Sequence, residues 1–221
     1  MPRKQFEREL QTLQDEVLLL GSMVDRAIER SIEALKRRDR EEARCIIDGD
    51  LDINRKRFDI EERCLHLLAT QQPLASDLRF IAAVLNIITE LERMGDHAEG
   101  IAKINIMMGE EPLLKPLIDI PRMADKARSM LQRSLEAFVK RDAEMATAIA
   151  LEDDEVDALY DQVYRELLTY MISDPKTITR ATYLLWVAHN LERIADRVTN
   201  ICERVVFLVT GRMEEINISK Y

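Results

Sequence analysis

The 221-residue chain is poor in the residues that interrupt helices or build sheets. It contains only 6 glycines and 6 prolines, and aromatic residues make up 5% of it. Ala, Leu, Glu, Arg, Ile and Met fill much of the remainder, and these residues favour helix. Hydrophobic residues account for 47% and charged residues for 33%, so the chain can bury a core. We therefore predict an all-α protein.

Cysteines and long apolar runs are also scarce. The three cysteines form no C-x-x-C pair, which favours reduced, buried thiols over disulfides or a zinc site. Residues 1–8 are polar and no apolar segment follows directly, so no signal peptide is indicated. The most apolar runs, 80–88 and 183–188, are shorter than the ~18 residues of a membrane span. These features predict a cytoplasmic protein.

The chain lacks the sequence signatures of several functional classes. The chain has 32 basic and 41 acidic residues, a formal net charge of −9, which argues against a nucleic-acid partner. It contains no phosphate-binding glycine loop, no nucleophile elbow and no H-E-x-x-H motif. The Glu-x-x-His spacing of a ferritin-like di-iron centre is missing as well. We therefore do not expect an enzyme.

Apolar spacing and capping residues predict six long helices. Asp39 is suited to cap the second helix, with Glu42 as its capping-box partner, and Asp174-Pro175 is suited to start the sixth. The predicted helices cover about 4–38, 39–72, 75–108, 121–141, 142–173 and 175–210. Three prolines between 109 and 121 mark a non-helical connector. We divide the chain into residues 1–109, a linker of residues 110–120, and residues 121–221.

The two parts repeat each other. Matching segments keep a nearly constant offset, and they are 30–35 with 133–138, 38–43 with 141–146, and 50–54 with 153–157. Repetition that keeps capping residues and a proline in register indicates duplicated structural units. Short connections within each part imply antiparallel neighbours. We predict two tandem, pseudo-symmetric, antiparallel three-helix bundles.

One motif, L-E-R-[MI]-[GA]-D, occurs at 91–96 and again at 191–196. In a helix it places Glu92 and Asp96 one turn apart on one face, and Glu192 and Asp196 likewise. Like charges at this spacing repel by a few tenths of a kcal/mol. Both acid pairs fall beside the apolar face of their helix, near a boundary between helices.

Two interpretations of these acids remain open. They can form a solvated flank that pairs with arginines, although Arg93 and Arg193 directly follow Glu92 and Glu192, and adjacent residues on a helix do not face each other. They can instead bind metal, since oxygen ligands suit hard or borderline cations such as Mg²⁺, Mn²⁺ and iron. The duplication then predicts two related sites.

The twin motifs in a duplicated three-helix pattern resemble the PhoU family. The stretch 71–79, Q-Q-P-L-A-S-D-L-R, is similar to a segment that precedes the third helix in this family, and the likeness covers the whole chain. The resemblance implies two three-helix bundles that bind metal ions (Fe, Mn, Mg or Zn), often as a multinuclear cluster. The residues implied are Glu92, Asp96, Glu192 and Asp196, with Asp50, Glu99, Asp153 and Asn200 as further candidates.

The resemblance also implies a role. Members of this family are regulators rather than enzymes and restrain phosphate uptake and the phosphate-starvation response. They contact the ATPase subunit of the phosphate ABC transporter and a sensor histidine kinase, usually as homodimers, and reach the membrane only through these partners. A metal-free helical scaffold and a carboxylate-bridged metalloenzyme are the alternatives.

The first motif departs from the family pattern. Gly100 stands where the second motif has Asn200, and the family more often has asparagine. We therefore expect the second site to be the better furnished of the two. The second half also has Ile178-Thr179-Arg180 in place of the D-L-R stretch.

Overall fold

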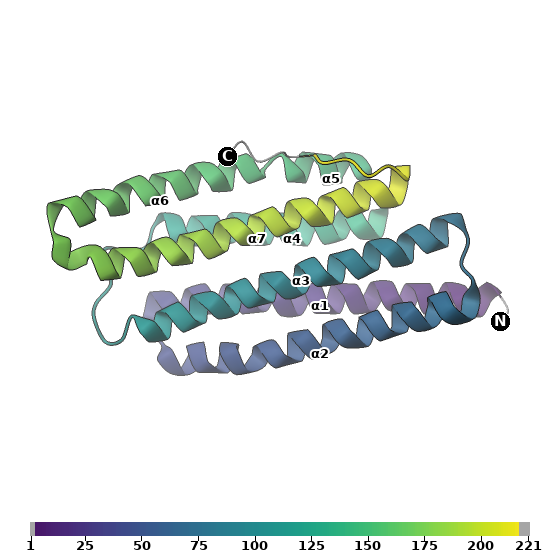
Figure 1. Ribbon diagram of the computed structural model, residues 1–221, viewed down its shortest axis with the longest axis horizontal. Helices are drawn as coiled ribbons and strands as arrows, with labels where there is room; N and C mark the ends of the chain where they lie inside the picture. Colours follow the sequence, from purple (N-terminus) through teal and green to yellow (C-terminus); the bar gives the residue numbers. More distant parts are fainter. Residues whose placement is uncertain (1–2, 217–221) are drawn as a thin grey trace.

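The computed structural model describes residues 3–216, in which helices and connecting turns occur and no strand (Figure 1). The all-α prediction is confirmed. The helices are α1 (Arg3–Arg37), α2 (Arg40–Gln71), α3 (Ala75–Met107), α4 (Asp119–Lys140), α5 (Ala143–Ala150), α6 (Asp153–Ser173) and α7 (Ile178–Thr210), with a 3-10 turn η1 (Pro175–Thr177) before α7. Within this range, no helix is long and apolar enough to cross a bilayer.

The helices form two bundles that lie side by side. α1, α2 and α3 make the first, and α4, the α5–α6 pair and α7 make the second (Figure 1). α3 packs against α7 and α1 packs against α4, so the pseudo-symmetric halves meet through two helix pairs. The predicted pair of tandem three-helix bundles is confirmed.

Local capping sets several helix starts. The side chain of Asp39 accepts hydrogen bonds from two backbone N–H groups at the start of α2 (3.1 and 2.9 Å), and Asp142 accepts one at the start of α5 (2.9 Å). Such caps contribute about 1 kcal/mol each. The expected capping-box partner, Glu42, instead binds Arg30 Nε of α1 at 2.5 Å. The cap is therefore reinforced by α1 rather than by a reciprocal bond within α2.

The predicted fifth helix, 142–173, is wrong as one continuous element. It breaks between α5 and α6, where residues 152–155 are all acidic. Adjacent acids repel inside a helix but are favourable at a helix N-terminus, where the dipole is positive. Glu152 also forms ion pairs with Arg133 (2.7 Å) and Lys126 (2.8 Å) of α4. These contacts hold the turn against α4.

α3 ends at Met107 and α4 begins at Asp119, two residues before the predicted helix start at 121, so residues 108–118 connect the two bundles. The carboxylate of Asp119 accepts hydrogen bonds from Arg122 Nη1 (3.0 Å) and Gln162 Nε2 of α6 (3.1 Å). Lys115 in the linker is buried and forms an ion pair with Glu166 of α6. The connector is thus attached to the second bundle.

One large apolar core extends through both bundles, and a small second cluster of Ala34, Ala43, Ile46 and Ala102 lies within the first. Leu91 of α3 and Leu191 of α7 are fully buried in the large core. Burying one leucine contributes about 1.5–3 kcal/mol, so the core determines how each helix is rotated about its axis. That rotation places the acid pairs of α3 and α7 beside the core rather than in it.

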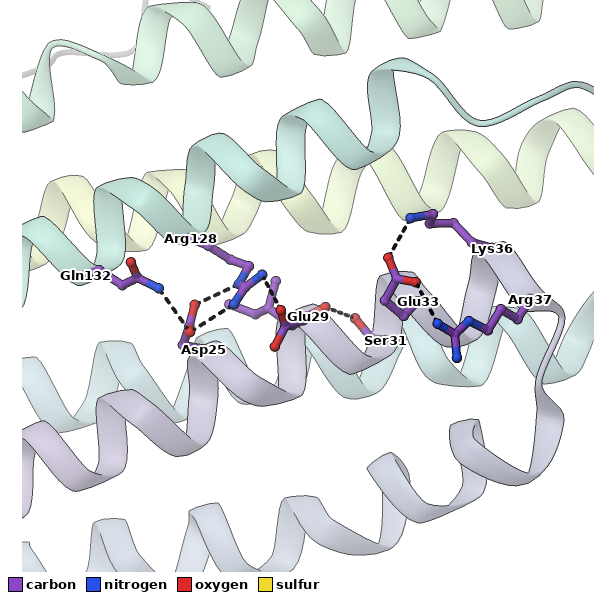
Figure 2. A network of polar contacts seen from close by, with 9 residues as sticks. Asp25, Glu29, Ser31, Glu33, Lys36, Arg37, Arg128 and Gln132 are labelled. Atoms are coloured by element: carbon purple, nitrogen blue, oxygen red, sulfur yellow. Dashed lines mark hydrogen bonds and ion pairs between the residues drawn. The ribbon is translucent and has the colours of Figure 1, made fainter.

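Polar contacts join α1 to α4. Arg128 of α4 binds both carboxylate oxygens of Asp25 on α1 (2.8 and 3.1 Å) and also Glu29 (3.0 Å), as Figure 2 shows. The two helices approach closely because Gly21 has no side chain. A Cβ atom there would lie 2.3 Å from Leu135 Cδ1. These contacts hold the two halves together at a second place.

Candidate metal sites

The first acid cluster lies between α2 and α3. It consists of one aspartate of α2 and three acids of α3, namely Asp50, Glu92, Asp96 and Glu99. Burial, reinforced by the charges of the three α3 acids, raises the pKa of Asp50 to about 6. Burial also raises the pKa of Glu92 and of Asp96. The structure therefore brings together four of the predicted site residues.

The two carboxylate oxygens of Asp50 have different surroundings. Its Oδ2 accepts a hydrogen bond from Asn54 Nδ2 (2.7 Å), while Oδ1 is buried and has no hydrogen-bond partner in the described part of the chain. A Cβ atom at Gly95 would lie 3.4 Å from Oδ1. An unsatisfied buried oxygen of this kind costs about 1–3 kcal/mol unless a ligand binds it.

The second cluster lies between α6 and α7. Its acids are Asp153, Asp157, Glu192 and Asp196. Asp153 is only 6% exposed, and burial together with its acidic neighbours raises its pKa to about 7. Burial and the charge of Asp196 likewise raise the pKa of Glu192 to about 7. Within residues 3–216, Asp153 Oδ1 has no hydrogen-bond partner.

Asp157 was not among the predicted ligands. It follows Asp153 by one helical turn, and burial and the charge of Asp196 raise its pKa. The register of the repeat contained the signal, because Asp157 matches Asn54 of the first half, and Asn54 contacts Asp50. The second cluster has an acid where the first has an amide.

Arg193 forms ion pairs with both Glu192 and Asp196. Its Nε is 3.1 Å from Glu192 Oε2 and its Nη1 is 2.9 Å from Asp196 Oδ2. The expectation that adjacent residues do not pair is wrong here, because the long arginine side chain folds back along the helix. Arg93 instead contacts Glu90 (3.2 Å). The second cluster therefore has a cationic neighbour of its own.

Asn200 is directed toward the other half of the molecule. Its Nδ2 donates to Glu90 Oε2 of α3 (3.0 Å), and Arg197 Nη1 lies 3.3 Å from the same oxygen. The amide therefore binds an acid of α3 that belongs to neither cluster.

Gly100 of α3 occupies the position that is pseudo-symmetric to Asn200 of α7. A Cβ atom there would be 3.1 Å from Asn190 Oδ1, which is already 3.0 Å from His97 Nδ1. Gly100 leaves room for Asn190 of α7. The difference between Gly100 and Asn200 therefore affects the contact between halves. Each cluster has four acids, because the second has Asp157 in place of Asn54 and the first has Glu99 in place of Thr199.

The donor sets fit a hard cation. All donors are oxygens, and each cluster has a buried carboxylate oxygen without a hydrogen-bond partner among the described residues. Burial raises the pKa of Asp50, Glu92 and Asp96 in the first cluster and of Asp153, Asp157, Glu192 and Asp196 in the second. No three His, Cys, Asp or Glu side chains between residues 3 and 216 converge closely enough, as placed, to hold an ion. Coordination would therefore require the carboxylates to draw together around the cation.

Residues 17–104 and 120–205, one segment in each bundle, match the description "PhoU domain". The chain belongs to the PhoU family. The chain is similar in sequence to two proteins that are each named phosphate-specific transport system accessory protein PhoU homolog. The one from Clostridium acetobutylicum is 39% identical over 218 residues, covering 98% of this chain and 100% of its own. The one from Aquifex aeolicus is 40% identical over 206 residues, 93% of each chain.

Solved structures agree with the PhoU assignment. The crystal structure of PhoU from Pseudomonas aeruginosa superposes with a TM-score of 0.89 at 34% identity, covering 94% of this chain and all of that one. The crystal structure of the phosphate transport system regulatory protein PhoU from Streptococcus pneumoniae gives a TM-score of 0.88 at 36% identity. It covers 95% of this chain and 99% of that one. The family assignment and the fold thus agree along nearly the whole of this chain.

Proposed function

We propose that this chain is a cytoplasmic regulator of phosphate homeostasis that restrains phosphate uptake and the phosphate-starvation response. The observation that carries the proposal is the match of both bundles to the PhoU domain, together with full-length relatives named as accessory proteins of the phosphate-specific transport system. It acts by binding other proteins rather than by catalysis.

The partners in this proposal are the ATPase subunit of the phosphate transporter and a sensor histidine kinase. A bacterial strain that lacks its own PhoU-family regulator and carries a phosphate-starvation reporter tests the role. Expression of this chain is expected to silence the reporter when phosphate is plentiful. A reporter that stays active despite normal protein levels contradicts the proposal. Purified ATPase subunit and kinase cytoplasmic domain, mixed separately with the chain, test the two contacts.

The proposal includes metal binding at both clusters. Asp50, Glu92, Asp96 and Glu99 hold one cation or cation cluster, and Asp153, Asp157, Glu192 and Asp196 hold the other. The raised pKa values and the unsatisfied oxygens support it. A bound cation supplies positive charge that offsets repulsion between acids and fixes α2 to α3 and α6 to α7. Elemental analysis of protein purified without a chelating column tests it and identifies iron, manganese, magnesium or zinc.

A metal-free scaffold is the second candidate, and Arg193 favours it. This guanidinium already supplies a positive charge to Glu192 and Asp196. Replacing Glu92 and Glu192 by glutamine and Asp96 and Asp196 by asparagine separates the two candidates. The scaffold retains regulation after this change, whereas the metal-dependent regulator loses it.

A further inference from the structure

The side chain of Arg193 bridges the two acids of the second L-E-R motif. Its Nη1 donates a hydrogen bond to Asp196 Oδ2 (2.9 Å), and its Nε lies 3.1 Å from Glu192 Oε2. The equivalent acids of the first motif, Glu92 and Asp96, form no ion pair within the described part of the chain. The two pseudo-symmetric acid pairs therefore differ in whether a cationic side chain neutralises them.

This difference follows from the residue three positions before each arginine. In the first motif Arg93 contacts Glu90 at 3.2 Å. The repeat places Asn190 at the equivalent position before Arg193. Because a neutral amide binds a guanidinium less strongly than a carboxylate does, Arg193 contacts the acids of its own motif instead. The preceding helical turn thus decides which partners the arginine of each motif takes.

The first cluster has a cationic neighbour only at its edge. Lys103 Nζ lies 2.6 Å from Glu99 Oε2, and the lysine side chain is 53% exposed. This lysine contacts one acid and leaves the motif acids of α3 to themselves. Arg193 contacts both motif acids of the second cluster at once, so it is placed to affect a ligand of those acids directly.

The guanidinium neutralises the second cluster without satisfying all of its oxygens. Glu192 Oε2 and Asp153 Oδ1 are buried and have no hydrogen-bond partner among the described residues. Arg193 Nε is therefore close to Glu192 Oε2 but is not aligned to donate to it. Such acceptors remain costly until a ligand of suitable geometry binds them. A metal ion can gather several oxygens around one point, which a planar guanidinium attached to the helix cannot do.

Arg193 can leave the acids without entering the protein interior. Its side chain is 43% exposed, whereas those of Glu192 and Asp196 are 15% and 32% exposed. The fold thus holds the acids more deeply than the guanidinium. A cation that binds the acids repels the guanidinium toward the solvent, where water hydrates it.

We propose that Arg193 competes with the metal ion for the carboxylates of the second cluster, so that metal binding and the ion pairs of Arg193 exclude each other. This inference rests on the metal binding proposed above. The second cluster then fills only at a higher metal concentration than its oxygens alone would require. Residue 190 sets the strength of the competition, because it determines whether the arginine has another acid within reach.

Titration of metal-free protein with Mn²⁺ tests the competition, with free Mn²⁺ measured by electron paramagnetic resonance. The background substitutions Glu92→Gln and Asp96→Asn disable the first cluster, so the titration reports the second. In this background Arg193→Gln is expected to lower the dissociation constant about tenfold, because no side chain then has to be displaced.

Arg93→Gln is the matched control, since Arg93 contacts Glu90 rather than the acids of its own motif. Its titration uses the background Glu192→Gln with Asp196→Asn, which reports the first cluster. The expected change in the dissociation constant is less than about twofold. The comparison separates competition at the acids from a general loss of positive charge.

Stability gives a second readout with the opposite sign. Metal-free Arg193→Gln is expected to have a lower melting temperature than the wild type, because Glu192 and Asp196 lose their counter-charge. An arginine with a purely structural role would, on removal, weaken both folding and metal binding. Tighter Mn²⁺ binding by a less stable protein is therefore specific to competition.

Asn190→Asp tests the part played by residue 190. Aspartate and arginine three residues apart do pair in this chain, as Asp119 and Arg122 do at 3.0 Å. The substitution is expected to draw Arg193 away from the cluster and so to strengthen Mn²⁺ binding. It also adds a negative charge, whose direct effect is the same without Arg193. The gain is therefore expected to be about threefold larger in the presence of Arg193 than in Arg193→Gln.

Three results overturn the proposal. Arg193→Gln leaves Mn²⁺ affinity at the second cluster unchanged or weaker, or Arg93→Gln strengthens the first cluster equally, or Asn190→Asp acts equally with and without Arg193. If the first cluster still binds Mn²⁺ in these cases, the metal part of the proposed function stands. Absence of Mn²⁺ binding at both clusters in every variant contradicts that part together with this proposal. The reporter strain tests the regulatory role separately.

Discussion

Arg128 of α4 holds the carboxylate of Asp25 on α1 through two hydrogen bonds, 2.8 and 3.1 Å long (Figure 2). Both side chains are less than one-fifth exposed. The pair connects two halves that the sequence repeat presents as separate bundles. A bidentate pair of this kind is among the stronger polar contacts in proteins.

Removing this pair tests how firmly the halves are joined. Asp25→Asn is expected to lower the free energy of unfolding by about 1–3 kcal/mol, because Arg128, largely buried, then keeps only Glu29 as a charged partner. Urea unfolding monitored by circular dichroism measures the change. Glu7→Gln is the control, since its ion pair with Arg3 is exposed and contributes at most about 1 kcal/mol. Equal effects of the two substitutions would contradict the coupling.

Metal removal is expected to destabilise the protein. A ligand at a hundred times its dissociation constant adds about 2.7 kcal/mol to the folded state, and chelation takes this away. The melting temperature of protein purified with its metal should fall on exhaustive chelation and recover on metal addition. The matched control is the fourfold variant Glu92→Gln, Asp96→Asn, Glu192→Gln, Asp196→Asn. If chelation moves both melting temperatures equally, these carboxylates are not the site.

Metal-free protein is expected to lose stability as the pH rises from about 4.5 to 7. Asp50, Asp153 and Glu192 have folded-state pKa values near 6 to 7, above those of the unfolded chain. At a pH between the unfolded-state pKa and the folded-state pKa of a group, the folded state binds more protons than the unfolded state. Each of the three groups therefore lowers stability as it ionises. Urea titrations across this range, with chelator present, measure the slope.

The pH effect has its own controls. Asp153→Asn in the metal-free protein should flatten the slope, because the amide does not ionise. Saturating metal should also flatten it, since a cation favours the ionised carboxylates. A metal-free slope of opposite sign in this window would show that other groups dominate the titration.

The two clusters are expected to differ in affinity because Asp157 stands where the first half has Asn54. Asp157→Asn should weaken metal binding at the second cluster by about tenfold, equal to about 1.4 kcal/mol, and leave the first unchanged. Asn54→Asp should strengthen the first cluster. Calorimetric titration of metal-free protein resolves the two sites, and unchanged affinities in both variants would exclude Asp157 from the site.

Much of the site follows from local sequence. The L-E-R motif places Glu92 with Asp96 and Glu192 with Asp196 on single helix faces, whatever the partners of those helices are. The repeat register also places Asp50 and Asp153 at equivalent positions of their helices. The direction of the Asn200 amide toward Glu90, 110 residues earlier, could not be predicted in this way. That contact depends on how α3 and α7 pack.

The sequence by itself determined the helices, their caps and the twofold repetition, because hydrogen bonding and apolar spacing within a helix are local. Asp39, Asp142 and the two L-E-R motifs have their structural effect within a few residues. Only the tertiary structure decided that α3 packs on α7 and that Asp25 meets Arg128. These outcomes depend on side chains brought together by helix packing, and the pattern along one helix does not contain that information.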